Sequence, residues 1–215
     1  MRRLVFIVEG DSEIILVNTV IIPYLYGLGF RNPMNAQTII TNRKQHKKGG
    51  VTGYGLFRNE LIRTLAQGAV VTTLIDFFRL PTDFPGFTTD SNRVSAIEEA
   101  IHIDFDQHPD LIPYIQKHEF EALLFSHIPG FEIVIDDLKQ LEQIRSILDI
   151  YPNPEDINNS PQTAPSKRLE NIFNYDKTLH SELILDEVNM EDITQKCPRF
   201  REWIDRIVVR LQLKK

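Results

Sequence analysis

The sequence has little cysteine, no long apolar run and no excess of positive charge. Its 215 residues include one cysteine, so no internal disulfide can form and no thiolate-rich zinc site can be assembled. Its apolar runs are interrupted well before the ~18 to 20 residues that a bilayer requires. The run after Met1-Arg2-Arg3 is cut off by acidic residues before any small-residue cleavage site, so no signal peptide is expected. These absences predict a cytoplasmic protein without membrane contact.

The charge balance excludes a surface that is basic throughout. The chain carries 24 Lys and Arg against 30 Asp and Glu, a formal net charge of −6. Phosphate affinity comes from clustered Lys and Arg, so a nucleic-acid site would have to be local. An enzyme that gathers carboxylates around metal ions would itself be acidic. At roughly 150 residues per domain, the length allows one well-cored domain, or a compact domain with a helical appendix.

Short apolar segments alternate with helical patterns in the first part of the chain. Strands are predicted by runs rich in β-branched residues, and helices by apolar residues that recur every three or four positions. The predicted strands are 3–8, 36–41, 69–75 and 111–116, and helices are expected over 14–28, 56–67, 93–103 and 118–126. This alternation is typical of βαβ units and predicts an α/β fold with a mainly parallel four-stranded sheet flanked by helices.

The pattern changes near residue 128. Helical patterns at 137–148, 166–175 and 199–211 are separated by polar loops, and no internal repeat or low-complexity tract is present. We therefore predict an α/β core over residues 1–127 and a helical C-terminal part over residues 128–215 that packs on it.

Acidic residues follow three of the predicted strands. Glu9 follows the first, Asp76 the third, and the segment His118-Glu119-Phe120-Glu121 the fourth. Ligands of open parallel sheets bind at the carboxyl ends of the strands, and carboxylates that meet there commonly hold Mg²⁺ or Mn²⁺. The pattern therefore indicates a metal site, although Glu9 and Asp76 at strand ends could instead serve as helix caps.

The segment after the fourth strand is not the H-E-x-x-H of zinc proteases, whose histidines lie one helical turn apart. If the segment is helical, Glu119 and Glu121 cannot both face the site, and we favour Glu121. His118 is equally compatible with a catalytic role and with a hydrogen-bonded role that supports the ligands.

Basic residues gather in a glycine-rich loop over residues 42–55. The G-x-x-x-x-G-K-[ST] pattern of a Walker loop is absent, but lysines beside glycines can bring charge and backbone N–H groups to a phosphate. A solvated surface loop would have the same composition. Lys167 and Arg168 present the same choice at the start of a helix, where cations are usually disfavoured, and this slightly favours a function. The phosphate-binding candidates are Arg43, Lys47, Lys48, Gly49, Gly50 and Arg168.

The loop over residues 77–92 is rich in aromatic residues. Phe77, Phe78, Phe84 and Phe87 could stack on bases. Such aromatics more often pack a loop onto the core, and we favour packing.

These motifs resemble a known family. Strand-Glu9-Gly10-x-x-Glu13-helix, followed by strand-Asp76, is similar to a Toprim domain, the catalytic module of topoisomerases, primases and the overcoming-lysogenization-defect (OLD) nucleases. More closely, VEGDSE, KKGG, TTLIDFF, PYIQKHEFEALLF and APSKRL resemble DUF4276, a family of Toprim-like proteins, over nearly the whole chain.

The resemblance assigns roles to the acids. It implies that Glu9 acts with metal or as a general acid or base, that Asp76 is the first acid of a metal-binding D-x-D motif, and that Glu13 belongs to a second metal site. Phe78 stands in place of the second Asp, which argues against topoisomerase-type chemistry. Asp83 is a candidate substitute or supporting residue.

Together, residues and resemblance predict a metal-dependent phosphodiesterase, a DNA or RNA endonuclease that uses one or two Mg²⁺ or Mn²⁺ ions. The expected metal ligands are Glu9, Glu13, Asp76, Glu119 and Glu121, and the expected catalytic residues are Glu9, Asp76, Glu121, Lys48 and Lys167, with His118 and Asp83 in support. The resemblance further implies a role in prokaryotic anti-phage defence with a separately encoded ABC- or SMC-like ATPase, and a homodimer is allowed.

Two alternatives remain open. The chain could be a non-catalytic nucleic-acid-binding or regulatory subunit that keeps the Toprim fold, which Phe78 favours. It could also be a small-nucleotide phosphohydrolase, which would need a closed pocket.

Overall fold

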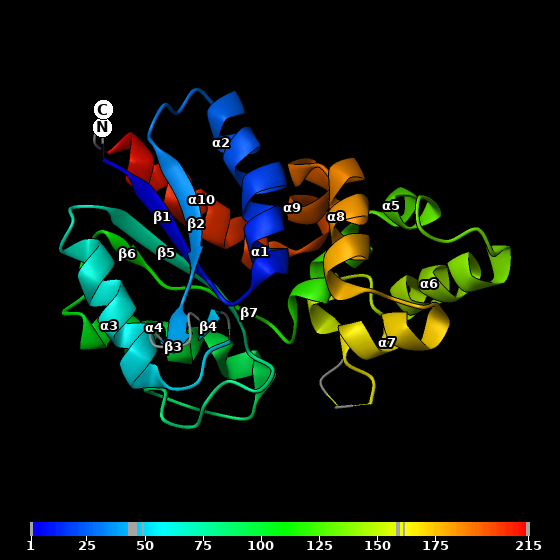
Figure 1. Ribbon diagram of the computed structural model, residues 1–215, viewed down its shortest axis with the longest axis horizontal. Coiled ribbons are helices and arrows are strands. Elements are labelled where there is room, and N and C mark those ends of the chain that lie inside the picture. The colour runs from blue at the N-terminus through cyan, green and yellow to red at the C-terminus, as the bar shows by residue number, and fades with distance from the viewer. Residues whose placement is uncertain (1, 43–46, 49, 158–159, 161, 214–215) are drawn as a thin grey trace.

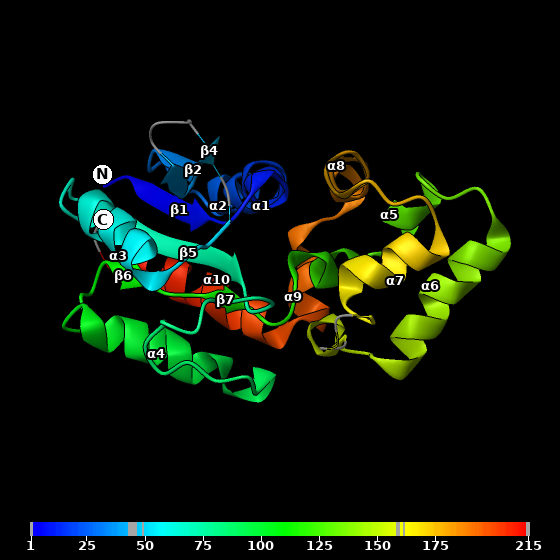
Figure 2. The same ribbon diagram turned by 60° about the horizontal axis from the view of Figure 1, so that its bottom comes forward.

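The computed structural model describes residues 2–42, 47–48, 50–157, 160 and 162–213, and its centre is a parallel sheet with helices on both faces (Figures 1 and 2). The strands run parallel in the order β2-β1-β5-β6, and β7 also pairs with β5. Their bounds are β1 Leu4–Val8, β2 Met34–Thr38, β5 Val70–Asp76, β6 Leu111–Ile112 and β7 Ile115–Gln116. The predicted fold class is confirmed, and it is consistent with a Toprim-like arrangement.

The helices occupy both the sheet region and the C-terminal part. The α-helices are α1 Asp11–Leu16, α2 Ile22–Gly27, α3 Tyr54–Leu65, α4 Val94–Asp104, α5 Ile128–Glu132, α6 Leu138–Ile150, α7 Pro165–Ile172, α8 Lys177–Glu187, α9 Met190–Lys196 and α10 Pro198–Gln212. The π-helix η1 Val17–Ile21 joins α1 to α2, just before Pro23, whose ring cannot donate to the helical ladder. Short 3₁₀ helices are η2 Ser91–Arg93, η3 Phe120–Ser126 and η4 Pro154–Asp156.

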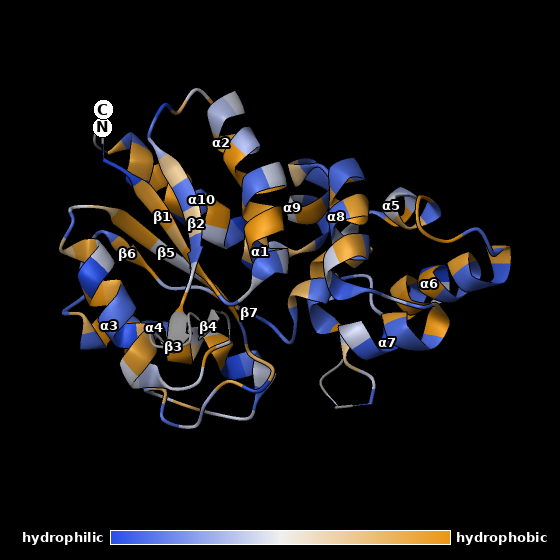
Figure 3. Ribbon diagram, in the orientation of Figure 1, coloured by the Kyte–Doolittle hydropathy of each residue, from blue (hydrophilic) through white to orange (hydrophobic). Residues whose placement is uncertain are grey.

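Side-chain alternation along β1 divides the core in two. Leu4, Phe6 and Val8 belong to the cluster shared with α1, α2 and α10, whereas Val5 and Ile7 belong to the cluster shared with α3 and α4. All five residues are fully buried. Burial on both faces explains why this strand is a continuous apolar run, and Figure 3 shows the same apolar character along the neighbouring strands.

The C-terminal chain returns to the sheet through α10. The Trp203 indole N–H donates to Thr72 Oγ1 at 2.7 Å, and its ring stacks on Tyr114 with centroids 4.4 Å apart. Helices α5, α6 and α7 lie to the side of the sheet, with α8 and α9 between (Figures 1 and 2). The apolar cluster of this sheet face continues into α6, α7 and α8. No described helix is long and apolar enough to cross a bilayer.

Several elements differ from the prediction. The fourth predicted strand is two short strands, because Pro113 and Tyr114 interrupt the ladder and Thr73 Oγ1 binds the backbone N–H and C=O of Tyr114 instead, each at 2.8 Å. The predicted helix over 118–126 is the 3₁₀ helix η3. The antiparallel pair β3 Ile40–Asn42 and β4 Lys47–Lys48 and the helices α5, α8 and α9 were not predicted.

Candidate functional site

Four carboxylates from separate parts of the chain converge at the carboxyl edge of the sheet. Glu9 directly follows β1, Glu13 lies in the first turn of α1, Asp76 ends β5, and Glu121 lies in η3. Their charges act on one another: Glu121 raises the pKa of Glu9, Glu9 raises that of Glu13, and all three raise that of Asp76. We call these four residues the carboxylate cluster.

Backbone N–H groups orient three members of the carboxylate cluster. Glu9 Oε2 accepts from the N–H of Asp76 at 3.1 Å, and Asp76 Oδ1 accepts from the N–H of Phe120 at 2.9 Å. Glu13 Oε2 accepts from the N–H of Gly10 at 2.8 Å, at the start of α1. A Cβ atom at Gly10 would lie 3.2 Å from the same oxygen, so a side chain there would press on Glu13. The Glu-Gly-x-x-Glu motif therefore brings two side chains that are close together in the chain, those of Glu9 and Glu13, into the same site.

Among the described residues, Lys177 is the cation that contacts the carboxylate cluster, and it was not among the predicted site residues. Its Nζ lies 3.0 Å from Glu121 Oε1. Burial alone would lower the pKa of Lys177, but the charges of Glu121, Asp76 and Glu13 outweigh it and raise the pKa. The Lys177 side chain is 49% exposed while that of Glu121 is 0% exposed, so the site opens to solvent on the lysine side.

A signal for Lys177 was present in the sequence. The Asp176 side chain accepts from the N–H groups of Thr178 and Leu179 and caps α8, which places Lys177 in the first turn of a helix. A cation is unfavourable there, which is the argument applied to Lys167 and Arg168. Lys177 is not identified in this way from the sequence, because no helix is predicted where α8 lies.

The carboxylate cluster is electrostatically unfavourable without a positive charge. Burial is the largest cause that raises the pKa of each member, and a second cause is repulsion, from Glu119 in the case of Glu121 and from other members in the case of the other three. Glu121 is completely buried, and its Oε2 has no hydrogen-bond partner among the described residues. A buried carboxylate oxygen without a partner is costly, so this atom is available to a cation.

The chemistry of the donors fits a hard divalent cation, which prefers carboxylate oxygens. In this conformation, however, no three described His, Cys, Asp or Glu side chains are arranged so that they could hold a metal ion. Lys177 contributes the positive charge instead. A metal ion at this place therefore requires the side chains to move closer together.

Three predicted site residues do not belong to the carboxylate cluster: Glu119 and Asp83 hold the starts of helices, and His118 lies in the chain before η3. Glu119 Oε2 accepts from the N–H of Ser166 at 3.0 Å and holds the start of α7. Asp83 Oδ2 accepts from the N–H of Tyr54 at 2.9 Å and holds the start of α3. His118 is buried with a left-handed φ of 67°, and burial together with the nearby charge of Lys117 lowers its pKa to about 4. His118 is therefore neutral at pH 7.

The predicted phosphate-binding residues are only partly described. Gly50 donates its N–H to the carbonyl of Glu9 at 2.9 Å, so the basic loop returns to the edge of the site. Lys47 and Lys48 lie in β4, but their side chains, like the whole of Arg43 and Gly49, lie outside the described residues.

The basic pair in α7 has partners of its own. Lys167 forms an ion pair with Glu170, one turn along the helix. Arg168 donates to the carbonyl of Thr163 at 2.8 Å, and its guanidinium lies 5.3 Å from the ring centroid of Tyr151. Neither contact is with the carboxylate cluster.

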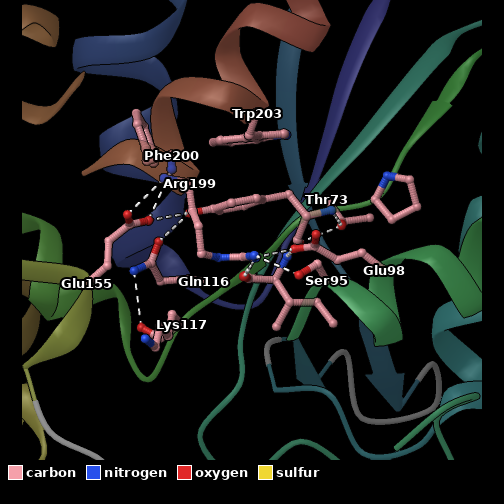
Figure 4. A network of polar contacts seen from close by, with 12 residues as sticks. Thr73, Ser95, Glu98, Gln116, Lys117, Glu155, Arg199, Phe200 and Trp203 are labelled. Atoms are coloured by element: carbon pink, nitrogen blue, oxygen red, sulfur yellow. Dashed lines mark hydrogen bonds and ion pairs between the residues drawn. The ribbon is translucent and has the colours of Figure 1, made fainter. Parts of the chain in front are cut away.

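A buried polar network fixes the chain that leads into η3 (Figure 4). Glu155 accepts from the N–H groups of Arg199 and Phe200 at the start of α10, at 2.9 and 3.0 Å. The Arg199 guanidinium donates to Glu98 at 2.7 Å, and Glu98 accepts from the N–H of Ile115 in β7 at 2.8 Å. Helix α10 thereby positions β7, three residues before Glu119.

Comparison with known proteins gives a family. No curated protein and no solved structure matches the chain. A family model described as "Domain of unknown function (DUF4276)" matches residues 8–208, a span that includes the carboxylate cluster, Lys177 and most of α10. The chain therefore belongs to the DUF4276 family.

Proposed function

We propose that the protein is a Mg²⁺- or Mn²⁺-dependent phosphodiesterase that cleaves DNA or RNA at the carboxylate cluster. The observation that carries this proposal is the convergence of Glu9, Glu13, Asp76 and Glu121 at the carboxyl edge of a parallel sheet. Buried acids with raised pKa values beside a half-exposed cation are typical of functional sites.

The residues divide the chemistry between them. Glu9, Glu13, Asp76 and Glu121 would hold the metal, which when bound activates water and neutralises charge on the phosphodiester. Among the described residues, Lys177 is the cation that pairs with the cluster, and its side chain is 49% exposed, so its ammonium can contact a phosphate oxygen as the substrate arrives. Burial raises the pKa of Glu9, and the resemblance implies a general acid or base at this position, so Glu9 is the candidate for moving a proton at the scissile bond.

The resemblance to OLD nucleases extends the proposal to a biological setting. It supports a role in prokaryotic anti-phage defence beside a separately encoded ABC- or SMC-like ATPase. It also keeps Lys48 as a proposed phosphate contact, because the backbone of the basic loop binds Glu9 through Gly50.

The proposal is tested by cleavage of labelled single-stranded DNA, plasmid DNA and RNA with Mn²⁺ or Mg²⁺. We expect Glu9→Gln and Asp76→Asn to abolish cleavage, and Lys177→Gln to reduce it by about 10²-fold or more, as loss of one charge-stabilising group does. Lys139→Gln is the matched control, because Lys139 is an exposed lysine that also lies in the first turn of a helix, α6, capped by an aspartate. Cleavage that survives both Glu9→Gln and Asp76→Asn would overturn the proposal.

A second function is favoured by one observation. Because no three described side chains are arranged to hold a metal ion, the chain could be a nucleic-acid-binding or regulatory subunit. Calorimetric titration with Mn²⁺ separates the two: a metal-binding enzyme releases or absorbs heat that Glu9→Gln abolishes, whereas a regulatory subunit gives no metal-dependent heat in either protein.

A further inference from the structure

A cavity of about 220 Å³ is lined by chain segments that adjoin the carboxylate cluster in the sequence. Its walls come from the loop that leaves β5 and from the chain before η3, and they include Phe77, Phe78, Arg79, Phe87, Thr88 and His118. Phe77 directly follows Asp76, and His118 lies two residues before Phe120, whose N–H binds Asp76. Along the chain, the cavity lining therefore begins one residue after Asp76 and three residues before Glu121.

Among the phenylalanines of the loop over residues 77–92, Phe78 is the one that does not pack into the core. Phe84 is buried, and Phe77 and Phe87 pack against the core cluster of α3 and α4. Phe78 is half-buried and belongs to neither hydrophobic cluster formed by the described residues. Its ring carries the exposed Arg79 guanidinium 5.1 Å from the centroid. An aromatic face beside a guanidinium is a typical platform for stacking a base.

The backbone around this cavity is held in an unusual conformation. Arg79 and His118 have φ values of 63° and 67°, in the left-handed region that residues other than glycine rarely adopt. The N–H of Phe78 donates to the carbonyl of His118 at 2.8 Å and ties the two segments together. Residues held this way are concentrated at ligand sites, because only the surrounding structure keeps them there.

We propose that this cavity receives a single nucleobase of the nucleic-acid substrate, unstacked from its neighbours, next to the phosphate at the carboxylate cluster. This inference rests on the proposed function. The ring of Phe78 would stack on the base, and Arg79 would contact its edge or the adjoining phosphate. The cavity is smaller than the ~300–1,000 Å³ of pockets for whole small molecules, which suits one ring system. A base that must leave its stack favours single-stranded substrate.

The test measures binding, so it does not depend on cleavage. A fluorescein-labelled oligothymidine of twelve residues is compared, by fluorescence anisotropy in buffer without divalent metal, with an abasic strand of the same length and charge. We expect wild type to bind the oligothymidine roughly 5- to 150-fold more tightly, the range that one base–aromatic stack gives. Phe78→Ala should lose this difference, while its affinity for the abasic strand stays unchanged. An oligouridine arm shows whether RNA is read in the same way.

A matched control separates stacking from a general effect on the fold. Phe105 is also partly buried and also carries a guanidinium, that of Arg58, 5.4 Å from its ring centroid, but it does not line the cavity. Phe105→Ala should bind both strands as wild type does. If Phe78→Ala does not fold, Phe78→Tyr and Phe78→Leu replace it, and only the tyrosine should keep the preference for bases.

The outcomes distinguish this inference from the proposed function. Equal affinity of wild type for the two strands, no binding of either, or a Phe78→Ala protein that keeps the preference would overturn the base site. A protein that prefers bases through Phe78 but cleaves no nucleic acid with metal would overturn the proposed activity alone. Metal-dependent cleavage of base-free and base-carrying strands at equal rates, in wild type and in Phe78→Ala, would overturn the base site alone.

Discussion

At the scale of single residues, Lys177 determines how strongly the carboxylate cluster destabilises the fold. Glu121 is fully buried, and the ammonium of Lys177 is the positive charge closest to it among the described residues. Uncompensated buried charge destabilises a fold strongly, whereas a half-exposed partner is partly screened by water. The cation therefore stabilises the fold and leaves the site open.

We expect Lys177→Gln to lower the free energy of unfolding at pH 8 by about 1 kcal/mol, because its half-exposed charge is screened. The loss should shrink at pH 5, since the raised pKa values let the carboxylates take up protons and lose their need for a cation. Urea unfolding at the two pH values measures this. Lys139→Gln, at an exposed lysine in the first turn of α6, should change neither value, and an equal loss at both pH values for Lys177→Gln would contradict the electrostatic explanation.

Asp76→Asn should stabilise the metal-free protein. The asparagine side-chain oxygen can still accept from the N–H of Phe120, while the charge that Glu9, Glu13 and Glu121 repel is gone. We expect a higher unfolding midpoint than that of wild type at pH 8, because burial and the repulsion from these three acids both disfavour the charged form of Asp76. Thermal unfolding measures it, and a lower midpoint than that of wild type would show that the carboxylate contributes favourable contacts that outweigh repulsion.

The acids could be found from the sequence because strand ends are local features. A run of β-branched residues predicts a strand, and the acid that comes at the end of the run, Glu9 or Asp76, marks where the strand ends. Lys177 reaches the site through the packing of α8 on α1 and η3, and the contact with α1 joins residues about 165 positions apart, as Ser12 and Lys177 are. The partners of Glu119 and Asp83 are also nonlocal backbone groups, at the starts of α7 and α3, which a linear pattern cannot indicate.

At the scale of elements, α10 acts as a layer of the sheet domain. Its Arg210 and the N-terminal Arg2 both bind Asp110, beside β6. Burial alone would raise the pKa of Asp110, but hydrogen bonds from Arg210 and Arg2 outweigh it and lower the pKa. The helix was predicted from its apolar spacing, which identifies the apolar face of the helix. Periodicity does not show which element that face packs on, so the position of α10 on the sheet was not predicted. The boundary at residue 128 stays a prediction.

We expect Asp110→Asn to be less stable than wild type at pH 7, with a difference that shrinks as the pH falls below about 4. The lowered pKa means that the charged carboxylate stabilises the fold above its unfolded pKa of about 3.9 and that this contribution is lost as the pH falls through the folded value. Denaturant unfolding across this pH range measures the difference. A difference that is constant with pH would show that packing, and not the charge, matters at this position.

Trp203→Ala should cost about 3–5 kcal/mol of the free energy of unfolding, as loss of a buried large aromatic does. Trp203→Phe keeps a ring against Tyr114 but removes the N–H that Thr72 accepts, so its cost should be about 1 kcal/mol. Urea unfolding of the two variants gives both values. Near-equal costs would mean that the hydrogen bond, and not the packing of α10 on the sheet, holds this contact.

At the scale of the whole molecule, part of the net charge of −6 comes from acids that lie close together. Four of the acids lie in one cluster whose pKa values are raised. A raised folded pKa stabilises the fold below the unfolded value and loses that contribution as the pH rises through the folded value. The metal-free protein should therefore lose stability through this cluster as the pH rises above the unfolded carboxyl pKa values of about 4, and a bound cation should restore it.

Saturation with Mn²⁺ at pH 8 is expected to raise the unfolding midpoint by about 5–10 °C. A ligand at 100 times its Kd stabilises by about 2.7 kcal/mol, and a chain of this length gains about 2–4 °C per kcal/mol. At pH 5.5 the shift should be smaller, because the cluster must release protons before it binds metal. Glu9→Gln and Glu121→Gln should respond weakly at both pH values, since each lacks one carboxylate of the cluster. Scanning calorimetry checks this, and a Glu9→Gln protein that gains as much as wild type would place Mn²⁺ elsewhere on the molecule.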